Sequence, residues 1–182
     1  MLHMNITSDR PILRRCTSCG VCATVCVKCA ISMHLDEEGF YRPTIDASLC
    51  NDCGLCTTVC YKFDSAAKTT TKEGLKQKPL FSAWATDDDI VDKTTSGGIG
   101  DLLAHQLLNE GYKVVGVVYN EDGIRAEHRI ATTKDELESF RGSKYIQSYT
   151  FDAFKEMVTN CRNEKYAVFG TPCQIYALNK LV

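Results

Sequence analysis

Eight of the eleven cysteines in this 182-residue chain lie in two copies of one spacing, Cys-x-x-Cys-x-x-Cys-x-x-x-Cys. Three thiolates at i, i+3 and i+6 of a tight loop can bind three corners of a cubane, and the fourth, one helical turn later, binds the neighbouring cluster. The spacing therefore predicts two 4Fe–4S clusters and electron transfer. The predicted ligand sets are Cys16, Cys19, Cys22 and Cys60 for one cluster, and Cys50, Cys53, Cys56 and Cys26 for the other.

A zinc site is the main alternative for these cysteines, because Cys-x-x-Cys pairs also build zinc ribbons. Zinc needs four ligands in two pairs, and the repeated triplets exceed that need. The spacing of Cys22, Cys26 and Cys29 matches radical-SAM enzymes, but Lys28 stands where those enzymes usually carry an aromatic residue. Clusters are therefore favoured; Cys29 is interpreted as a spare thiol, and Cys161 as a small buried hydrophobic residue.

The two cysteine runs form an internal repeat of a cysteine loop and a short helix. Residues 31–46 between them predict two strands that turn at Glu38-Gly39. This order resembles a bacterial-type two-cluster ferredoxin, although the proline that usually follows the fourth cysteine is Val27 in one copy and Tyr61 in the other. The expected organisation is a lead at 1–15, a ferredoxin-type domain at 16–62, a polar linker at 63–79 and a further domain at 80–182.

From residue 80 onward, apolar runs typical of strands alternate with helical patterns, which predicts an α/β domain with a mostly parallel sheet. The overall fold class is therefore α+β. Strands are expected at 80–86, 113–119, 123–131 and 165–170. Helices are expected from the glycine turn to Gly111, from the Thr133–Glu136 capping box through Phe140, at 150–164, and from Gln174 onward. The first of these helices would turn Ile99, Leu102, Leu103, Leu107 and Leu108 inward.

The last residues, 178–182, continue an amphipathic pattern without a stop signal, so we expect the second domain to be incomplete. The hydrophobic content of 44% and the net charge of −2 are ordinary for a globular protein and give no indication of nucleic-acid binding. Neither a signal peptide nor a run of about 20 apolar residues is evident. Metal-bound thiols in a reducing cytoplasm are therefore expected, rather than disulfides.

Two loops in the second part are candidates for ligand binding. Ser96-Gly97-Gly98 precedes a helix, where backbone N–H groups can approach a phosphate, although an ordinary helix-start turn is an equal alternative. Thr171-Pro172-Cys173-Gln174 follows a buried strand, at the edge where α/β sheets bind ligands. Cys173 is not favoured as a nucleophile, because no histidine base is evident; His105 and His128 lie in other elements and are expected at the surface.

Taken together, these motifs resemble the beta-subunit family of coenzyme F-420-reducing hydrogenases and dehydrogenases. The resemblance rests on the cysteine repeat, T-S-G-G before a helix, R-G-S-K-Y at 141–145 and V-F-G-T-P-C-Q at 168–174. It implies a flavoprotein that binds FAD and passes electrons between clusters and a hydride acceptor. The FAD-site residues that the resemblance implies are Ser96, Gly97, Gly98, Ser143, Lys144, Thr171, Pro172, Cys173 and Gln174.

The expected function is thus that of an iron–sulfur flavoprotein oxidoreductase subunit, acting on coenzyme F-420 or another small molecule with a redox partner protein. The alternative is a ferredoxin-like electron carrier with an α/β docking domain and no substrate of its own. A weaker alternative is a cluster with a structural role alone. Flavin bands in the visible spectrum would distinguish the first two.

Overall fold

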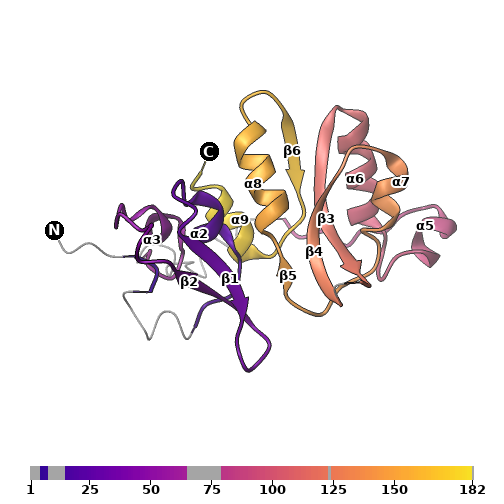
Figure 1. Ribbon diagram of the computed structural model, residues 1–182. Helices are drawn as coiled ribbons and strands as arrows, with labels where there is room; N and C mark the ends of the chain where they lie inside the picture. Colours follow the sequence, from indigo (N-terminus) through magenta and orange to yellow (C-terminus); the bar gives the residue numbers. More distant parts are fainter. Residues whose placement is uncertain (1–4, 8–14, 65–78, 123, 182) are drawn as a thin grey trace.

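The computed structural model describes residues 5–7, 15–64, 79–122 and 124–181 (Figure 1). The predicted linker at 63–79 lies almost entirely outside the described residues. Within them, no helix combines the length and the apolar character needed to cross a membrane.

The cysteine repeat folds as two short helices and a hairpin, α2 (Val21–Val25), β1 (Ile31–Leu35), β2 (Tyr41–Ile45) and α3 (Leu55–Val59). β1 and β2 pair antiparallel, as the sequence predicts. The turn between them is closed by a 2.8 Å hydrogen bond from Asp36 N to Phe40 O, and Gly39 has a φ of +80°. The glycine allows this left-handed turn at low cost.

The two cysteine loops share one backbone conformation. The residue two positions after the first cysteine has a positive φ in both copies, +59° at Ser18 and +51° at Asp52. The residue that precedes each helix is a left-handed glycine, with φ of +75° at Gly20 and +77° at Gly54. A non-glycine side chain is strained in this region, yet both copies adopt it at the same position. The repeat in sequence is therefore also a repeat in backbone geometry.

The second part contains α5 (Asp88–Asp92), α6 (Ile99–Asn109), β3 (Tyr112–Asn120), β4 (Arg125–Ala131), α7 (Lys134–Glu138), β5 (Ser148–Tyr149), α8 (Phe151–Asn160), β6 (Lys165–Val168) and α9 (Pro172–Leu178). Its sheet has the order β5-β4-β3-β6. The two outer pairings are parallel, as expected, and the central pairing of β3 with β4 is antiparallel. The connection between β3 and β4 is too short for a parallel crossover, so the two strands form a hairpin.

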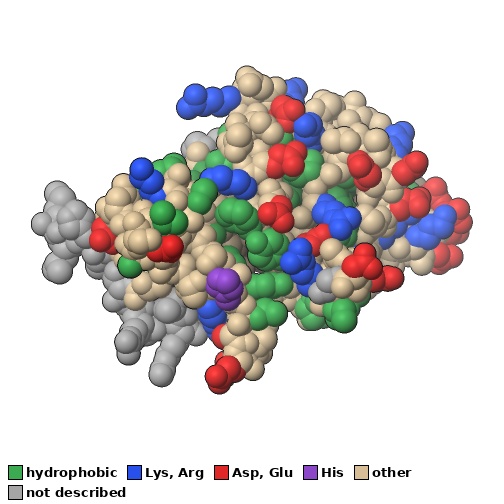
Figure 2. Space-filling model, in the orientation of Figure 1, with side chains coloured by type: hydrophobic (Ala, Val, Ile, Leu, Met, Phe, Trp, Pro, Cys, Tyr) green, Lys and Arg blue, Asp and Glu red, His purple; other side chains and the backbone are tan. Residues whose placement is uncertain are grey.

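Helices cover both faces of this sheet: α8 and α9 lie on the side of the cysteine repeat, and α6 and α7 on the other (Figure 1). Successive residues of β3 pack on opposite faces of the sheet. Val115 packs in the cluster that contains Phe154 of α8, whereas Val114 packs in the cluster that contains Leu137 of α7. Both valines are fully buried, which fits the predicted strand between two layers. Acidic side chains gather at the far end of the molecule, around α5 (Figure 2).

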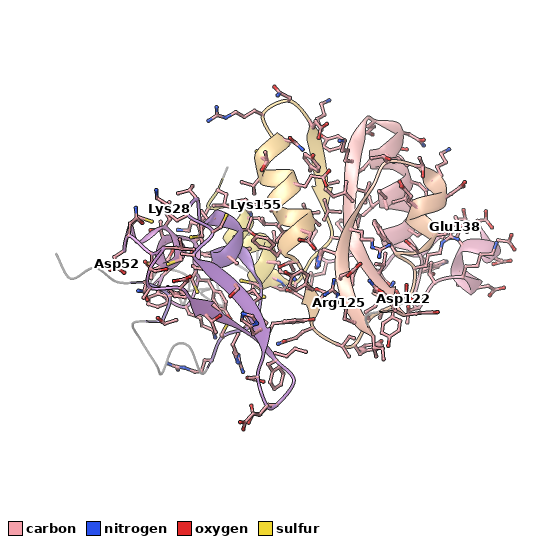
Figure 3. All side chains as sticks on the ribbon, in the orientation of Figure 1. Lys28, Asp52, Asp122, Arg125, Glu138 and Lys155 are labelled. Atoms are coloured by element: carbon pink, nitrogen blue, oxygen red, sulfur yellow. The ribbon has the colours of Figure 1, made fainter. Side chains whose placement is uncertain are left out.

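The cysteine repeat shares a hydrophobic core with the sheet layer. Val21 of α2 and Val59 of α3 are 0% and 3% exposed and lie in the same cluster as Phe154 of α8 and Ala177 of α9. Polar contacts reinforce this packing: Lys155 reaches from α8 toward α2 and donates to Thr24 O at 3.3 Å (Figure 3). The N-terminal repeat is therefore packed on α8 and α9 through buried apolar surface.

The prediction of a strand at 80–86 is wrong. The segment pairs with neither sheet; its backbone instead meets the glycine turn, where Ala85 N donates to Gly97 O at 2.6 Å. Three of its large side chains, Leu80, Phe81 and Trp84, are 66–93% exposed. An apolar run alone does not specify a strand, because the strand also needs an available sheet edge.

Three expectations about burial are also wrong. Leu102 and Leu103 are 38% and 50% exposed, because α6 packs through the row that contains the buried Ala104. His128 is buried on β4, where its ring meets Phe154 at 4.9 Å, rather than exposed. Cys161 is exposed, because it lies just beyond the last residue of α8.

Candidate functional site

The eight predicted cluster cysteines divide between two cavities. The first cavity is lined by Cys16, Cys19, Cys22 and Cys60, and the second by Cys26, Cys50, Cys53 and Cys56. Each cavity thus contains three cysteines of one run and the fourth cysteine of the other run. The predicted exchange of the fourth ligand requires this grouping. Cys29 lines neither cavity, in keeping with its interpretation as a spare thiol.

The thiols of the first cavity lie in an apolar environment. Burial raises the pKa of the Cys19 thiol to about 12 and raises the pKa of Cys22 well above its usual value. The sulfurs of Cys19, Cys16 and Cys60 act on the pKa of Cys22 in the same direction. A bound metal reverses this preference, since a coordinating thiol is deprotonated outright. Four soft thiolates that need positive charge are a suitable donor set for an iron–sulfur cluster.

Backbone N–H groups also reach two of the sulfurs. Ser18 N donates to Cys16 Sγ at 3.4 Å, and Ala30 N donates to Cys26 Sγ at 3.3 Å. Hydrogen bonds to sulfur are one of the means by which proteins set the reduction potential of a cluster. Within the described ranges, no group of three or more His, Cys, Asp or Glu side chains converges as a site for a single metal ion would require.

A cavity of about 370 Å³, here called the ligand pocket, lies at the side of the sheet that α6 and α7 cover. Six of the nine residues predicted for FAD line it: Ser96, Gly98, Ser143, Lys144, Thr171 and Gln174. The glycine turn, the loop after α7 and the start of α9 therefore meet at one place, although they are far apart in sequence. The volume is within the range of small-molecule and cofactor sites.

Gly97, Pro172 and Cys173 do not line this pocket. Gly97 lies against the segment before α5, where an added Cβ would come within 2.9 Å of Ala83 O and Trp84 Cβ. Pro172 and Cys173 form the first turn of α9, and Thr171 Oγ1 lies 3.1 Å from Cys173 Sγ. These residues shape the loops that border the pocket.

The loop after α7 is fixed to the start of α6 by strong contacts. Arg141 donates to both carboxylate oxygens of Asp101, at 2.9 and 3.3 Å, and the Asp101 side chain is 6% exposed. Ser143 N donates to Thr95 Oγ1 at 2.8 Å. A bidentate arginine–carboxylate pair fixes orientation as well as distance, so this wall of the pocket is held in place without a ligand.

Lys144 binds the backbone just beyond α7. Its ammonium group donates to the carbonyl oxygens of Ser139, Phe140 and Arg141 at 3.2, 3.0 and 2.7 Å. Burial lowers the pKa of this lysine. Its ammonium group is therefore held by the carbonyl oxygens of the C-cap of α7 and of the two residues that follow it. Any effect of Lys144 on a ligand would act through its charge and not through a direct hydrogen bond.

The start of α9 is organised by a buried glutamine. Gln174 Oε1 accepts from Thr171 N at 2.7 Å and completes a capping box. The amide nitrogen of Gln174 donates to Ser148 Oγ, at 3.4 Å, so α9 is joined to β5 on the pocket wall. Thr171 and Gln174 thus have structural partners in addition to their place at the pocket.

Several pocket residues were missed by the sequence reasoning. Gly116, Phe140, Ile146 and Phe169 also line the cavity. Gly116 has no side chain because the ring of Phe140 lies on its backbone: an added Cβ would be 2.4 Å from Phe140 Cδ2. A glycine in the middle of a β-branched run indicates such a close approach and could have predicted it.

Gly98 and Gly100 differ in the atoms that an added side chain would meet. Gly98 has a φ of +75°, and an added Cβ would meet Ile90 Cγ2 at 2.7 Å rather than the pocket. Glycine is therefore needed at 98 for the turn itself. Gly100 also lines the pocket, but it lies in α6, and an added Cβ would have no atom within 4 Å. Gly100 is thus the position at which a side chain can be introduced without disturbing the turn.

Comparison with known proteins relates the sequence to one family. Residues 80–155 match the family described as coenzyme F420 hydrogenase/dehydrogenase, beta subunit, N-terminal part. The chain is 36% identical over 108 residues to the coenzyme F420 hydrogenase subunit beta of Methanococcus voltae, an alignment that covers 58% of this chain and 38% of that protein. The subunit beta of Methanosarcina barkeri is 30% identical over 102 residues, or 54% and 35% of the two chains.

A third relative, from Methanothermobacter thermautotrophicus, carries the same name and is 32% identical over 106 residues, 37% of its length. The chain therefore spans less than two fifths of each of these relatives. The matched family segment includes the glycine turn and the loop after α7, which form two walls of the ligand pocket. Through this segment, the chain is similar to the family of coenzyme F420 hydrogenase and dehydrogenase beta subunits.

Proposed function

We propose that this protein is an iron–sulfur flavoprotein oxidoreductase subunit that carries electrons between two 4Fe–4S clusters, FAD and a hydride-accepting small molecule such as coenzyme F420. The observation that carries the proposal is the sorting of eight cysteines into two cavities, each with the crosswise set that two-cluster ligation requires. The family and the names of the relatives supply the redox context.

The ligand pocket is the proposed flavin site. Its walls offer backbone N–H groups at the glycine turn, hydroxyls at Ser143 and Thr171, and the apolar rings of Phe140 and Phe169. This mixture of apolar surface and a few placed polar groups suits an aromatic cofactor with a polar tail. When bound, a flavin would supply the exchange between two-electron and one-electron chemistry, and the protein would supply orientation and electrostatics.

The residues around the ligand pocket would bind the flavin, orient it and shield it from solvent. The Arg141–Asp101 pair and the Ser143–Thr95 bond hold the loop that borders the pocket. The ammonium of Lys144 places positive charge at the same wall, beside the carboxyl end of α7. The buried amide of Gln174 fixes the first turn of α9 against β5. No acid or base group is assigned to the substrate.

The first test is the content of the anaerobically reconstituted protein. Iron and acid-labile sulfide should each approach about eight per chain, four for each cubane. A preparation that binds zinc and excludes iron would overturn the cluster assignment.

The second test is FAD titration, monitored by quenching of flavin fluorescence. Gly100→Leu should weaken FAD binding at least tenfold, because the side chain would project from the wall of the pocket, while Gly100→Ala should bind nearly as well as the wild type. Asn109→Leu, at the exposed end of α6, is the matched control. Absence of FAD uptake by the wild type, or unchanged affinity in Gly100→Leu, would favour the alternative function of a simple electron carrier.

A further inference from the structure

The two cavities differ in their relation to the ligand pocket. α9 borders both the pocket and the first cavity: Thr171 and Gln174 line the pocket, and Ala177, which is fully buried, lines the first cavity. Gln174 and Ala177 are three residues apart, about 4.5 Å along the helix axis. A single turn of α9 therefore separates the wall of the pocket from the wall of the first cavity.

A second connection joins the same two sites. Thr150 Oγ1 donates to the backbone oxygen of Cys19 at 3.2 Å. Thr150 follows β5, whose Ser148 lines the pocket and accepts from Gln174 Nε2. The loop of the first cavity is thus hydrogen-bonded to the segment that forms the pocket wall.

The second cavity has no comparable neighbour. Among the residues that the structure describes, its lining comes only from residues 5–56. Cys53 is exposed, and two apolar side chains at the cavity, Val27 and Leu55, are 71% and 40% exposed. Lys28 and Asp52, which also line it, lie at the end of the molecule away from the sheet (Figure 3). More of the residues that line the second cavity are therefore exposed to solvent than of those that line the first.

We propose that the two clusters act in series, in the order solvent, second cavity, first cavity, ligand pocket. This order rests on the proposed function. Cys26, Cys50, Cys53 and Cys56 would hold the cluster that accepts one electron from a one-electron carrier, and Cys16, Cys19, Cys22 and Cys60 would hold the cluster that then receives this electron. Two such transfers, with two protons from solvent, would reduce one two-electron acceptor in the pocket. The same path serves the reverse direction. Electron transfer weakens steeply with distance, so direct exchange between the second cluster and the pocket is disfavoured.

The order is tested by the exposure of each cluster to a soluble paramagnet. The dithionite-reduced protein is studied by EPR power saturation with and without a dysprosium chelate, which speeds the relaxation of nearby, accessible spins. The signal that Cys53→Ser removes should relax at least several-fold faster with the chelate. The signal that Cys19→Ser removes should change little. Equal acceleration of both signals, or the reverse pattern, would overturn the order.

Two further variants assign the signals without removing a ligand, in case a cysteine variant does not fold. Ala177→Ser adds a hydroxyl at the wall of the first cavity, and Val27→Ser adds one at the second. Ala177→Ser should shift the midpoint potential of the protected signal alone, and Val27→Ser that of the accessible signal alone. A protein without iron would defeat the proposed function and this order together. Two intact clusters with the opposite assignment would defeat the order only.

Discussion

The two cysteine loops have the same spacing and the same backbone conformation, yet their surroundings differ. The helix after the first loop, α2, is covered by α8 and α9, and Val21 at its start is 0% exposed. At the equivalent position of the second loop, Leu55 is 40% exposed. The sequence repeat therefore builds two similar cysteine loops, and the rest of the chain covers only the first of them.

The difference shows that position in the fold can assign different roles to identical local motifs. A cluster beside α9 would be close to the ligand pocket, whereas a cluster at the exposed loop would be accessible to a carrier. Three pairs of changes at equivalent positions, and one change at His128, can break or sharpen this comparison.

The largest expected effect comes from the exchanged ligands. Cys60→Ser should remove the cluster of the first cavity, and Cys26→Ser that of the second, because each side chain lines the cavity of the other run. Iron should fall by about four per chain in each variant. Cys29→Ser, which lines neither cavity, is the control. EPR spectra in which Cys60→Ser abolishes the cluster of Cys50, Cys53 and Cys56 would show that the ligands are not exchanged.

The next effect distinguishes the two glycines that precede the helices. A Cβ at Gly20 would lie 1.9 Å from Thr150 Oγ1, in addition to the positive φ. Gly20→Ala should therefore cost about 3 kcal/mol or more, the sum of left-handed strain and overpacking. Gly54→Ala should cost about 1 kcal/mol, from the backbone strain. The measurement is the temperature at which cluster absorbance is lost under argon.

Removal of the blocking hydroxyl provides the control for this pair. The double variant Gly20→Ala, Thr150→Ala should recover part of the loss, although it also removes the bond to Cys19 O. Equal destabilisation by Gly20→Ala and Gly54→Ala would contradict the idea that α8 and its preceding residue enclose only the first loop.

The stability of the layer formed by β4 and α8 should depend on pH through His128. Burial lowers the pKa of this histidine to about 4, against the weaker opposing effect of the Phe169 backbone. The unfolded state, with a pKa of about 6.5, binds the proton first as the pH falls. Stability should therefore decline from pH 6.5 toward pH 4, by up to about 3 kcal/mol. His128→Phe keeps an aromatic contact with Phe154 and should show a smaller decline in unfolding experiments between pH 7.5 and 5; an unchanged decline would exclude His128 as its source.

The smallest expected effect concerns Val21 and Leu55, the equivalent side chains that differ in exposure between the two loops. Val21→Ala should destabilise the protein by about 2 kcal/mol, because the valine is fully buried in the core shared with α8 and α9. Leu55→Ala should cost less than about 1 kcal/mol, since the leucine is partly exposed. Thermal unfolding of the two variants, side by side, checks the ranking. Similar losses would mean that the two loops are covered to the same extent.

The sequence by itself determined the features that depend on local geometry. The cysteine spacing predicted which side chains share a cavity, because i, i+3 and i+6 positions on a tight loop must face one point. The hairpin at Glu38-Gly39 and the capping box at Thr133–Glu136 followed from turn and cap chemistry. The family resemblance and the position of strand ends predicted nine residues for FAD. Six of these nine line one pocket.

Only the tertiary structure decided which surfaces are covered. The exposed Trp84, the buried His128 and the exposed Leu103 all differ from the sequence pattern, because burial depends on what another element places against a side chain. The central β3–β4 hairpin and the glycine at 116 beneath Phe140 depend in the same way on partners chosen by the fold. For the same reason, the sequence contains two nearly equivalent cysteine loops, and the packing of α8 and α9 against one of them makes the two sites different.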